Sequence, residues 1–332
     1  MRSVHDSVIA VTGARGFLGR HVVKAVERRG LRVRSLGRHD GDLRDPTIAE
    51  RLLAGADTVI HLAADVGGVG YLKSCPGRAF HDNYTLGLNV VRAAIRGGVR
   101  RLVLAGTPCS YAGDAELPLT EADLLHGVPA GDTGTYGYAK LATSLAAATL
   151  CPALGDTDTV TVIPSNLYGP GDAFDETRGH VVAALIRKAV LAAELGHDSF
   201  DVWGDGSATR DFVYVTDVAK GIAAVAASRE RFDGTMLNLG SGRETSIREI
   251  ASIVAAAAGS NLRPRFLADK PVGYTRRVMS VAQAAERLGY VASTGLVEGI
   301  RKTVEWLRAS GTVATWLTGE RAADRVATRR AA

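Results

Sequence analysis

The sequence is poor in cysteine, with only Cys75, Cys109 and Cys151 among its 332 residues. Their spacing forms no obvious pair and no metal-ligand pattern, so neither a disulfide-stapled fold nor a metal site is expected. Free thiols fit a reducing compartment, and we therefore expect a cytoplasmic protein.

The chain also lacks a hydrophobic run long enough to span a membrane, and its N-terminus shows no signal-like apolar segment. The net charge of +5 comes from Arg and Lys scattered among Asp and Glu, with one dense basic cluster at residues 325–330. This distribution favours small anionic ligands and argues against nucleic acid as a partner. With 46% hydrophobic and 23% charged residues, the composition is that of a globular protein. A length of 332 residues can hold one large α/β domain, or one large domain and one small one.

A glycine-rich turn stands near the start of the chain. The apolar run at 8–12 predicts a buried strand, and a helical pattern follows it to about residue 29. Glycines between a strand and a helix allow a tight turn, close approach of the backbone to a pyrophosphate and close packing of the two elements. The residues expected to hold that pyrophosphate are Gly13, Gly16, Phe17, Leu18 and Gly19.

The second strand, expected at 31–36, is followed by Arg38 instead of the acidic residue that would grip the ribose hydroxyl of NAD. An arginine there suits a 2′-phosphate, so NADP is favoured, and Arg15 in the glycine turn could join it. Asp42 and Leu43 begin the next connection, where they could border the adenine ring.

Three further strands are expected at 58–64, 101–105 and 159–163, alternating with helical patterns. This alternation predicts a doubly wound parallel sheet of the Rossmann type, in which ligands bind at the carboxyl ends of the strands. The residues that fall at those ends are Leu62, Ala63, Ala64, Thr107, Cys109, Pro164, Asn166 and Leu167. We expect a dinucleotide-binding domain over 1–165. A smaller α/β substrate-binding subdomain over 166–332 would return in part to the first domain.

Tyr136 and Lys140 stand four residues apart in a predicted helix, which places both side chains on one face. A tyrosine near neutral pH is a proton donor, and a lysine cation beside it stabilises the phenolate that donation leaves. This pair suits the protonation of an alkoxide as a carbonyl is reduced. On its own the spacing is also common on helix surfaces.

Together, the glycine turn, Thr107 and the Tyr136–Lys140 pair resemble the extended short-chain dehydrogenase/reductase superfamily. Stretches at 61–69, 166–172, 179–181, 202–206 and 210–212 are similar to the GDP-L-fucose synthases within it. Those enzymes epimerise a GDP-4-keto-6-deoxymannose at C3 and C5 and then reduce C4 with NADPH.

The resemblance implies roles for single residues. Tyr136 would protonate the C4 oxygen, Lys140 would lower the tyrosine pKa, and Thr107 would hydrogen-bond the carbonyl. Cys109 and His180 match the pair that inverts C3 and C5, since a thiol and an imidazole can act as base and acid. The residues implied to contact the GDP-linked keto-sugar are Asn166, His180, Val181, Lys188, Trp203 and Arg210. The resemblance also implies a homodimer.

The sequence departs from the family pattern at three places. Pro108 stands beside Thr107, where it removes an N–H. Asp65 replaces a lysine, which would turn a positive charge negative near the substrate, and Val272 replaces an aspartate. These departures leave open another keto-sugar or a heptose as substrate. Two further alternatives are a GDP-mannose 3,5-epimerase without net redox change and a catalytically silent NADP-binding regulator.

Overall fold

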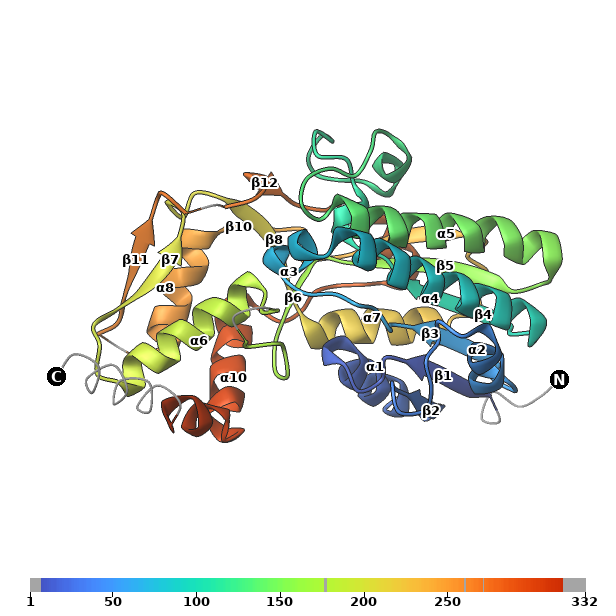
Figure 1. Ribbon diagram of the computed structural model, residues 1–332, viewed down its shortest axis with the longest axis horizontal. Coiled ribbons are helices and arrows are strands. Elements are labelled where there is room, and N and C mark those ends of the chain that lie inside the picture. Colours follow the sequence, from blue (N-terminus) through green and yellow to red (C-terminus); the bar gives the residue numbers. More distant parts are fainter. Residues whose placement is uncertain (1–6, 176–177, 260, 271, 319–332) are drawn as a thin grey trace.

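The computed structural model describes residues 7–175, 178–259, 261–270 and 272–318, so the basic cluster at 325–330 lies outside the described residues. A six-stranded parallel sheet with the order β2-β1-β3-β4-β5-β9 organises the larger part of the molecule (Figure 1). Its strands are β1 (Val8–Thr12), β2 (Arg32–Leu36), β3 (Thr58–His61), β4 (Arg101–Ala105), β5 (Asp158–Pro164) and β9 (Thr235–Leu239).

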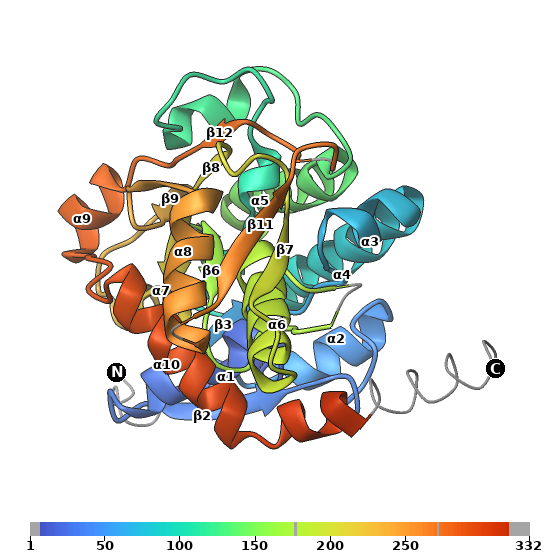
Figure 2. The same ribbon diagram turned by 90° about the vertical axis from the view of Figure 1, so that its left-hand side faces the viewer.

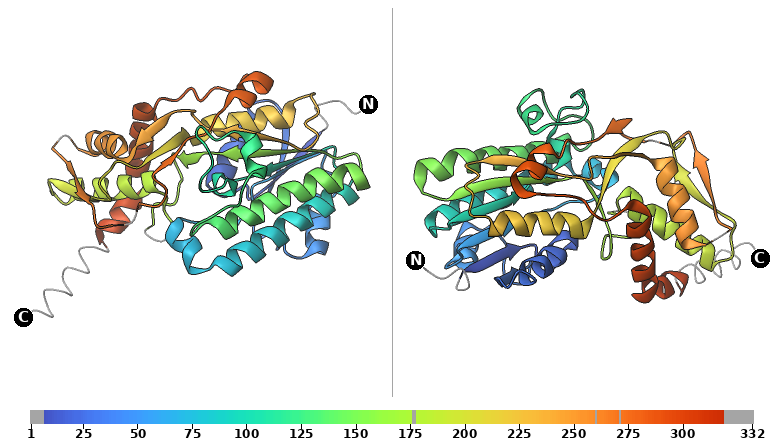
Figure 3. Two further views of the ribbon diagram at one scale, coloured as in Figure 1. Left: turned by 90° about the horizontal axis from the view of Figure 1, so that it is seen from above. Right: turned by 180° about the vertical axis from the view of Figure 1, so that it is seen from behind.

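Helices cover both faces of this sheet, as Figures 1 and 3 show. One face packs on α2 (Pro46–Leu53), α4 (Pro76–Arg96) and α5 (Gly134–Leu154), and the other on α1 (Phe17–Glu27), α7 (Val215–Ala227) and α9 (Ala282–Leu288). Fully buried Val, Ile and Leu side chains of the strands fill both interfaces. The predicted doubly wound fold is therefore confirmed.

The strand order reverses between β1 and β3. The connection after β1 leads outward to β2, whereas β3, β4 and β5 extend the sheet in the opposite direction. At such a point two connections leave the sheet on opposite sides and open a crevice at the carboxyl ends of the strands. The glycine turn after β1 and the segment after β3 both lie at this edge.

A smaller α/β part completes the molecule at the left of Figure 1 and faces the viewer in Figure 2. It contains α6 (Val181–Glu194), α8 (Ile247–Ala258), α10 (Leu296–Ala309), β6 (Asn166–Tyr168), β7 (Ser199–Trp203), β8 (Thr209–Tyr214), β10 (Glu244–Ser246), β11 (Arg263–Leu267) and β12 (Arg276–Arg277). Its helices and strands share a separate hydrophobic core. No helix in the described ranges has both the length and the apolar character needed to cross a membrane.

The predicted elements and the observed ones differ in instructive ways. The helical pattern expected between the strands at 58–64 and 101–105 forms two helices, a short α3 (Val69–Ser74) and then α4, which begins at Pro76. The return to the first sheet is made by α7 and β9, and β9 pairs with β5. Two turns of 3-10 helix, η2 (Pro108–Ser110) and η3 (Glu121–Leu125), follow β4.

One close approach fixes the helix α5 against η2. A Cβ atom added to Gly137 would lie 2.0 Å from the carbonyl oxygen of Cys109. The hydroxyl of Ser110 donates a hydrogen bond of 2.9 Å to the carbonyl of Gly137. Because Gly137 follows Tyr136 directly, this contact sets the position of Tyr136 relative to the end of β4.

Gly137→Ala is therefore expected to force α5 away from η2 and to lower the free energy of unfolding by about 3 kcal/mol. Urea denaturation measures the change. Gly77→Ala serves as the control, because Gly77 also lies in a helix but a Cβ there meets nothing within 4 Å. Its effect should be neutral or stabilising by about 0.5–1 kcal/mol. Equal midpoints for the two variants would contradict the tight contact.

Candidate functional site

The glycine turn after β1 forms an anion-binding end of α1. Gly13 has φ +66°, and a Cβ on it would lie 2.7 Å from the backbone nitrogen of Ala63. A Cβ on Gly19 would lie 2.1 Å from the carbonyl oxygen of Gly13, so neither position accepts a side chain. Gly16 caps the helix without a side-chain hydrogen bond, which leaves the N–H groups of Phe17 and Leu18 available to a phosphate.

Two arginines flank the turn after β2. Arg15 and Arg38 are both exposed, and a Cβ on Gly37 would lie 3.6 Å from the Cδ of Arg15. Arg15 thus lies over the same turn that carries Arg38. The acidic residue of that turn, Asp40, accepts a 2.7 Å hydrogen bond from the backbone N–H of Gly37. The arrangement suits a phosphate on the adenosine ribose.

The residues expected around adenine have other contacts as well. The carboxylate of Asp42 is paired with Arg44 at 2.7 Å, and this partner lowers the pKa of Asp42. Leu43 packs in the core formed with α2 and α4, so only its backbone can border a ligand. Leu62, Ala63 and Ala64 are half-buried beside the glycine turn.

The end of β4 brings a hydroxyl, a thiol and a phenol together. Thr107 accepts a 3.3 Å hydrogen bond from the backbone N–H of Cys109, which leaves its hydroxyl proton for a ligand. Cys109 packs against the cluster of Leu72, Ala79 and Tyr136. Pro108 occupies the first position of η2, where an N–H is not needed, so this departure fits the turn without a lost hydrogen bond.

Tyr136 and Lys140 are both buried on α5, 7% exposed each. Burial lowers the pKa of Lys140 to about 8. Burial, together with the charge of a Cys109 thiolate, raises the pKa of Tyr136 above its ordinary value. In the protein without ligands, desolvation of the phenolate therefore dominates. That Lys140 lowers the tyrosine pKa in the catalytic complex stays a prediction. A neutral phenol remains suited to proton donation.

His61 is a buried neighbour of Lys140 that the sequence did not single out. Burial and repulsion from Lys140 lower the pKa of His61 to about 3, so the ring stays neutral. Its Nδ1 lies 2.8 Å from the hydroxyl of Thr12. It begins the stretch 61–69 that resembles the GDP-L-fucose synthases, but its position in an apolar strand gave no signal of a role.

His180 caps the start of α6 and is about half exposed. Two residues earlier, the guanidinium of Arg178 lies 4.5 Å from the centroid of the Tyr71 ring. Tyr71 packs against the same cluster as Cys109. The carbonyl of Arg178 also accepts a 3.2 Å hydrogen bond from the N–H of Gly68. These contacts tie the segment that carries His180 to the side of the site that carries Cys109.

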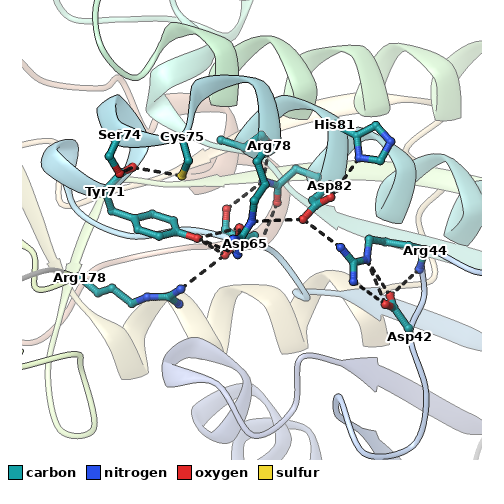
Figure 4. Close-up of polar contacts among 12 residues, drawn as sticks. Asp42, Arg44, Asp65, Tyr71, Ser74, Cys75, Arg78, His81, Asp82 and Arg178 are labelled. Atoms are coloured by element: carbon teal, nitrogen blue, oxygen red, sulfur yellow. Dashed lines mark hydrogen bonds and ion pairs between the residues drawn. The ribbon is translucent and has the colours of Figure 1, made fainter.

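Figure 4 shows the charges around Asp65. The hydroxyl of Tyr71 donates to the Asp65 carboxylate at 2.7 Å, and Arg78 and Arg178 lie 3.3 and 3.8 Å from it. Asp65 is 4% exposed, whereas both arginines are largely exposed. The expected negative charge is therefore compensated, because two guanidinium groups pair with the Asp65 carboxylate, and Arg78 also lies 3.6 Å from Asp82.

A second cluster lies on α6, β7 and β8. The Nζ of Lys188 donates to the carbonyl of Asp201 at 3.2 Å and lies 5.5 Å from the centroid of the Trp203 ring. Trp203 is 55% exposed and therefore is not a core residue. Arg210 donates to the carbonyl of Val272 at 3.1 Å, and burial together with a neighbouring arginine lowers its pKa.

Val272 connects these residues. A Cβ on Gly204 would lie 2.1 Å from a methyl group of Val272, which places Val272 beside the Trp203 segment. The site thus offers an exposed aromatic face and two cations from separate elements. Such a set suits a nucleoside diphosphate.

The remaining candidate residues lie where β5 meets the smaller part. Pro164 ends β5, and the side-chain amide of Asn166 donates to the carbonyl of Asp211 at 2.9 Å. Leu167 packs on the core beside α1 and α7, and Val181 is exposed at the start of α6.

The comparisons with known proteins agree with this arrangement. The profile of the NAD dependent epimerase/dehydratase family matches residues 9–240. A GDP-L-fucose synthase of Azorhizobium caulinodans is 32% identical over 300 residues, which cover 90% of this chain and 95% of that protein. A GDP-L-colitose synthase of Yersinia pseudotuberculosis is 29% identical over 304 residues, 90% of this chain and 97% of that protein.

A crystal structure of a GDP-L-fucose synthetase from Naegleria fowleri bound to NADP has a TM-score of 0.81 at 26% identity, over 93% of this chain and 95% of that one. The fold and the glycine turn define a dinucleotide-binding protein of the doubly wound class. The chain belongs to the NAD dependent epimerase/dehydratase family. The predicted resemblance, including the similarity to GDP-L-fucose synthases, is confirmed.

The buried state of Lys140 predicts a stabilising substitution. An unfolded chain keeps the lysine protonated up to its ordinary pKa of 10.5, whereas the folded protein releases the proton near pH 8. The free-energy cost of burying the Lys140 ammonium is therefore fully present below pH 8 and disappears as the pH rises from 8 to 10.5.

Lys140→Met should raise the free energy of unfolding of the ligand-free protein at pH 7 by roughly 2–3 kcal/mol. Urea denaturation at pH 7 and at pH 9.5 measures this, and the advantage of the variant should shrink at the higher pH. Lys73→Met, at an exposed lysine, should show no such trend. A destabilised Lys140→Met protein at pH 7 would contradict the assigned burial.

The contacts of Asp65 predict that lysine, the residue common at this position in the family, would destabilise this protein. Asp65→Lys would place a buried cation beside Arg78 and Arg178 and should lower the free energy of unfolding by about 3 kcal/mol. Thermal denaturation measures the loss. Val66→Lys, at the exposed neighbouring position, is the control and should be nearly neutral. An unchanged stability of Asp65→Lys would show that the arginines do not depend on the carboxylate.

Proposed function

We propose that this protein is an NADP-dependent epimerase and reductase of a GDP-linked 4-keto-6-deoxyhexose, like the GDP-L-fucose synthases. The observation that carries the proposal is the contact between Cys109 and Tyr136 at the end of β4. A reductase needs the tyrosine, the lysine and the hydroxyl, but not a thiol beside them. The thiol gives the same site a second kind of proton chemistry.

The epimerisation uses the acidity that a C4 ketone gives to the protons at C3 and C5. One of Cys109 and His180 removes such a proton, and the other delivers a proton to the opposite face of the enolate. The hydroxyl of Thr107 donates a hydrogen bond to the C4 oxygen and stabilises the enolate. No further residue is required, since the same two groups serve both carbons.

The reduction uses α5. NADPH bound along the glycine turn would supply a hydride to C4. Tyr136 then delivers its proton to the C4 oxygen, and Lys140 stabilises the phenolate that remains. The neutral state of Tyr136 in the free protein favours this direction of transfer. Arg15 and Arg38 support the use of NADPH rather than NADH.

The substrate would lie across both parts of the molecule. Lys188 and Arg210 would neutralise the diphosphate, Trp203 would cover the base, and Asn166 and Val181 would border the sugar. Asp42, Leu43 and the segment Leu62–Ala64 would line the adenosine and ribose of the cofactor, with Pro164 and Leu167 near the nicotinamide.

We infer a cytoplasmic homodimer. The three cysteines are free, which fits a reducing compartment. Tyr138 and Leu145 lie two turns apart on α5 and are each more than a third exposed, as is Phe80 on the adjacent α4. A second copy would cover these apolar side chains, and light scattering measures the mass directly.

Incubation with GDP-4-keto-6-deoxymannose and NADPH tests the function. We expect the absorbance of NADPH to fall and the sugar to appear as GDP-L-fucose. NADH should be used poorly. Absence of NADPH oxidation, together with epimerisation of GDP-mannose, would favour the epimerase without net redox change.

Cys109→Ser separates the two half-reactions. The variant should lose inversion at C3 and C5 by at least about 100-fold, because a hydroxyl is a far weaker acid than a thiol. Oxidation of GDP-L-fucose by NADP should persist, since it needs only Thr107, Tyr136 and Lys140. Cys75→Ser is the matched control and should retain both reactions. Equal loss of both reactions in Cys109→Ser would argue against separate roles.

A further inference from the structure

The connection between β6 and α6 contains a buried carboxylate with an unused oxygen. The side chain of Asp172 is 3% exposed. Its Oδ1 accepts a 2.7 Å hydrogen bond from the N–H of Ala173, whereas its Oδ2 is buried and has no hydrogen-bond partner among the residues that the structure describes. A buried carboxylate oxygen without a partner costs free energy and calls for a reason beyond packing.

The imidazole of His180 lies beside this carboxylate, on the side of Oδ1. Its Nδ1 lies 3.8 Å from the Oδ1 of Asp172, and its ring is about half exposed. The buried carboxylate and the exposed ring thus place Nδ1 toward the protein interior. Which nitrogen of a histidine carries the proton is set by the partner of the other nitrogen.

We propose that Asp172 is a positioning residue for His180, which rests on the function proposed above. Its carboxylate accepts the Nδ1–H of the imidazole. This fixes the tautomer in which Nε2 is unprotonated and can accept a proton from the sugar. A small rotation of the half-exposed ring closes the distance of 3.8 Å to a hydrogen bond in the free protein, and bound substrate would hold the ring in that orientation.

The surrounding contacts hold Asp172 still. The carbonyl of Pro170 lies 2.8 Å from the Nε2 of His21 on α1. The ring of Phe174 stacks on that of Trp306 of α10 at a centroid distance of 6.1 Å. The carboxylate is therefore fixed from both sides, while the ring of His180 keeps freedom to turn toward it.

The tautomer of His180 can be measured by NMR, so this test of the proposal needs no enzyme assay. In ¹⁵N-histidine-labelled protein above pH 8, where an ordinary imidazole is neutral, we expect the ¹⁵N shifts of His180 to report Nδ1–H. In Asp172→Asn the side-chain amide can donate to Nδ1, so the Nε2–H form should gain population. His180→Gln assigns the signal. The same tautomer population in both proteins would overturn the proposal, as would Nε2–H in the unsubstituted protein.

The His81–Asp82 pair is the control in the same spectrum. The Nδ1 of His81 lies 3.0 Å from Asp82, so Asp82→Asn should alter the His81 signal and leave that of His180 unchanged. Asp172→Asn should do the reverse. Calorimetry of NADP binding to each variant verifies that the protein is folded.

The two half-reactions give a second measurement. The rate at which GDP-4-keto-6-deoxymannose takes up solvent deuterium at C3 and C5 should fall about 10- to 100-fold in Asp172→Asn. Hydride transfer from GDP-L-fucose to NADP should fall far less. Equal losses would assign Asp172 to the fold and contradict the proposal. A protein with Asp172 intact that takes up no deuterium would instead refute the proposed function, and the ¹⁵N shifts would still decide the role of Asp172.

Discussion

The contact of α5 with η2 determines the chemistry of this site. Because Gly137 has no side chain, the helix approaches the carbonyl of Cys109 directly, and the hydroxyl of Ser110 donates a hydrogen bond to the carbonyl of Gly137. Tyr136 and Lys140 are carried on the helix, and Thr107 and Cys109 on the strand end. One backbone contact therefore sets all four side chains relative to one another, and the parallel sheet places them beside the glycine turn.

Burial then decides the charge state of the site. Tyr136 and His61 stay neutral, whereas Lys140, with a pKa lowered to about 8, still carries its charge near pH 7. At the rim, Arg78 and Arg178 pair with the buried Asp65. A buried ammonium beside a neutral phenol is suited to stabilising the phenolate that proton donation leaves.

The sequence predicted what local patterns determine. The strand, glycine turn and helix at 8–27 follow from β-branched residues and three glycines, and they form as predicted. The return of β9 to the first sheet was anticipated only in outline, because the pairing of β9 with β5 joins residues more than 70 positions apart. The neutralisation of Asp65 was missed for the same reason, since Arg178 lies far along the chain. Asp172 lay within a motif that the sequence marked, but its orphaned oxygen is visible only in the fold.

The central claim is that Cys109 and His180 begin a reaction that Tyr136 completes. Turnover of GDP-4-keto-6-deoxymannose in D₂O with unlabelled NADPH tests it most directly. The account predicts GDP-L-fucose with deuterium at C3 and C5 and protium at C4, with one NADPH oxidised for each sugar. A reduced product without deuterium at C3 and C5, or deuterium uptake without oxidation of NADPH, would contradict it.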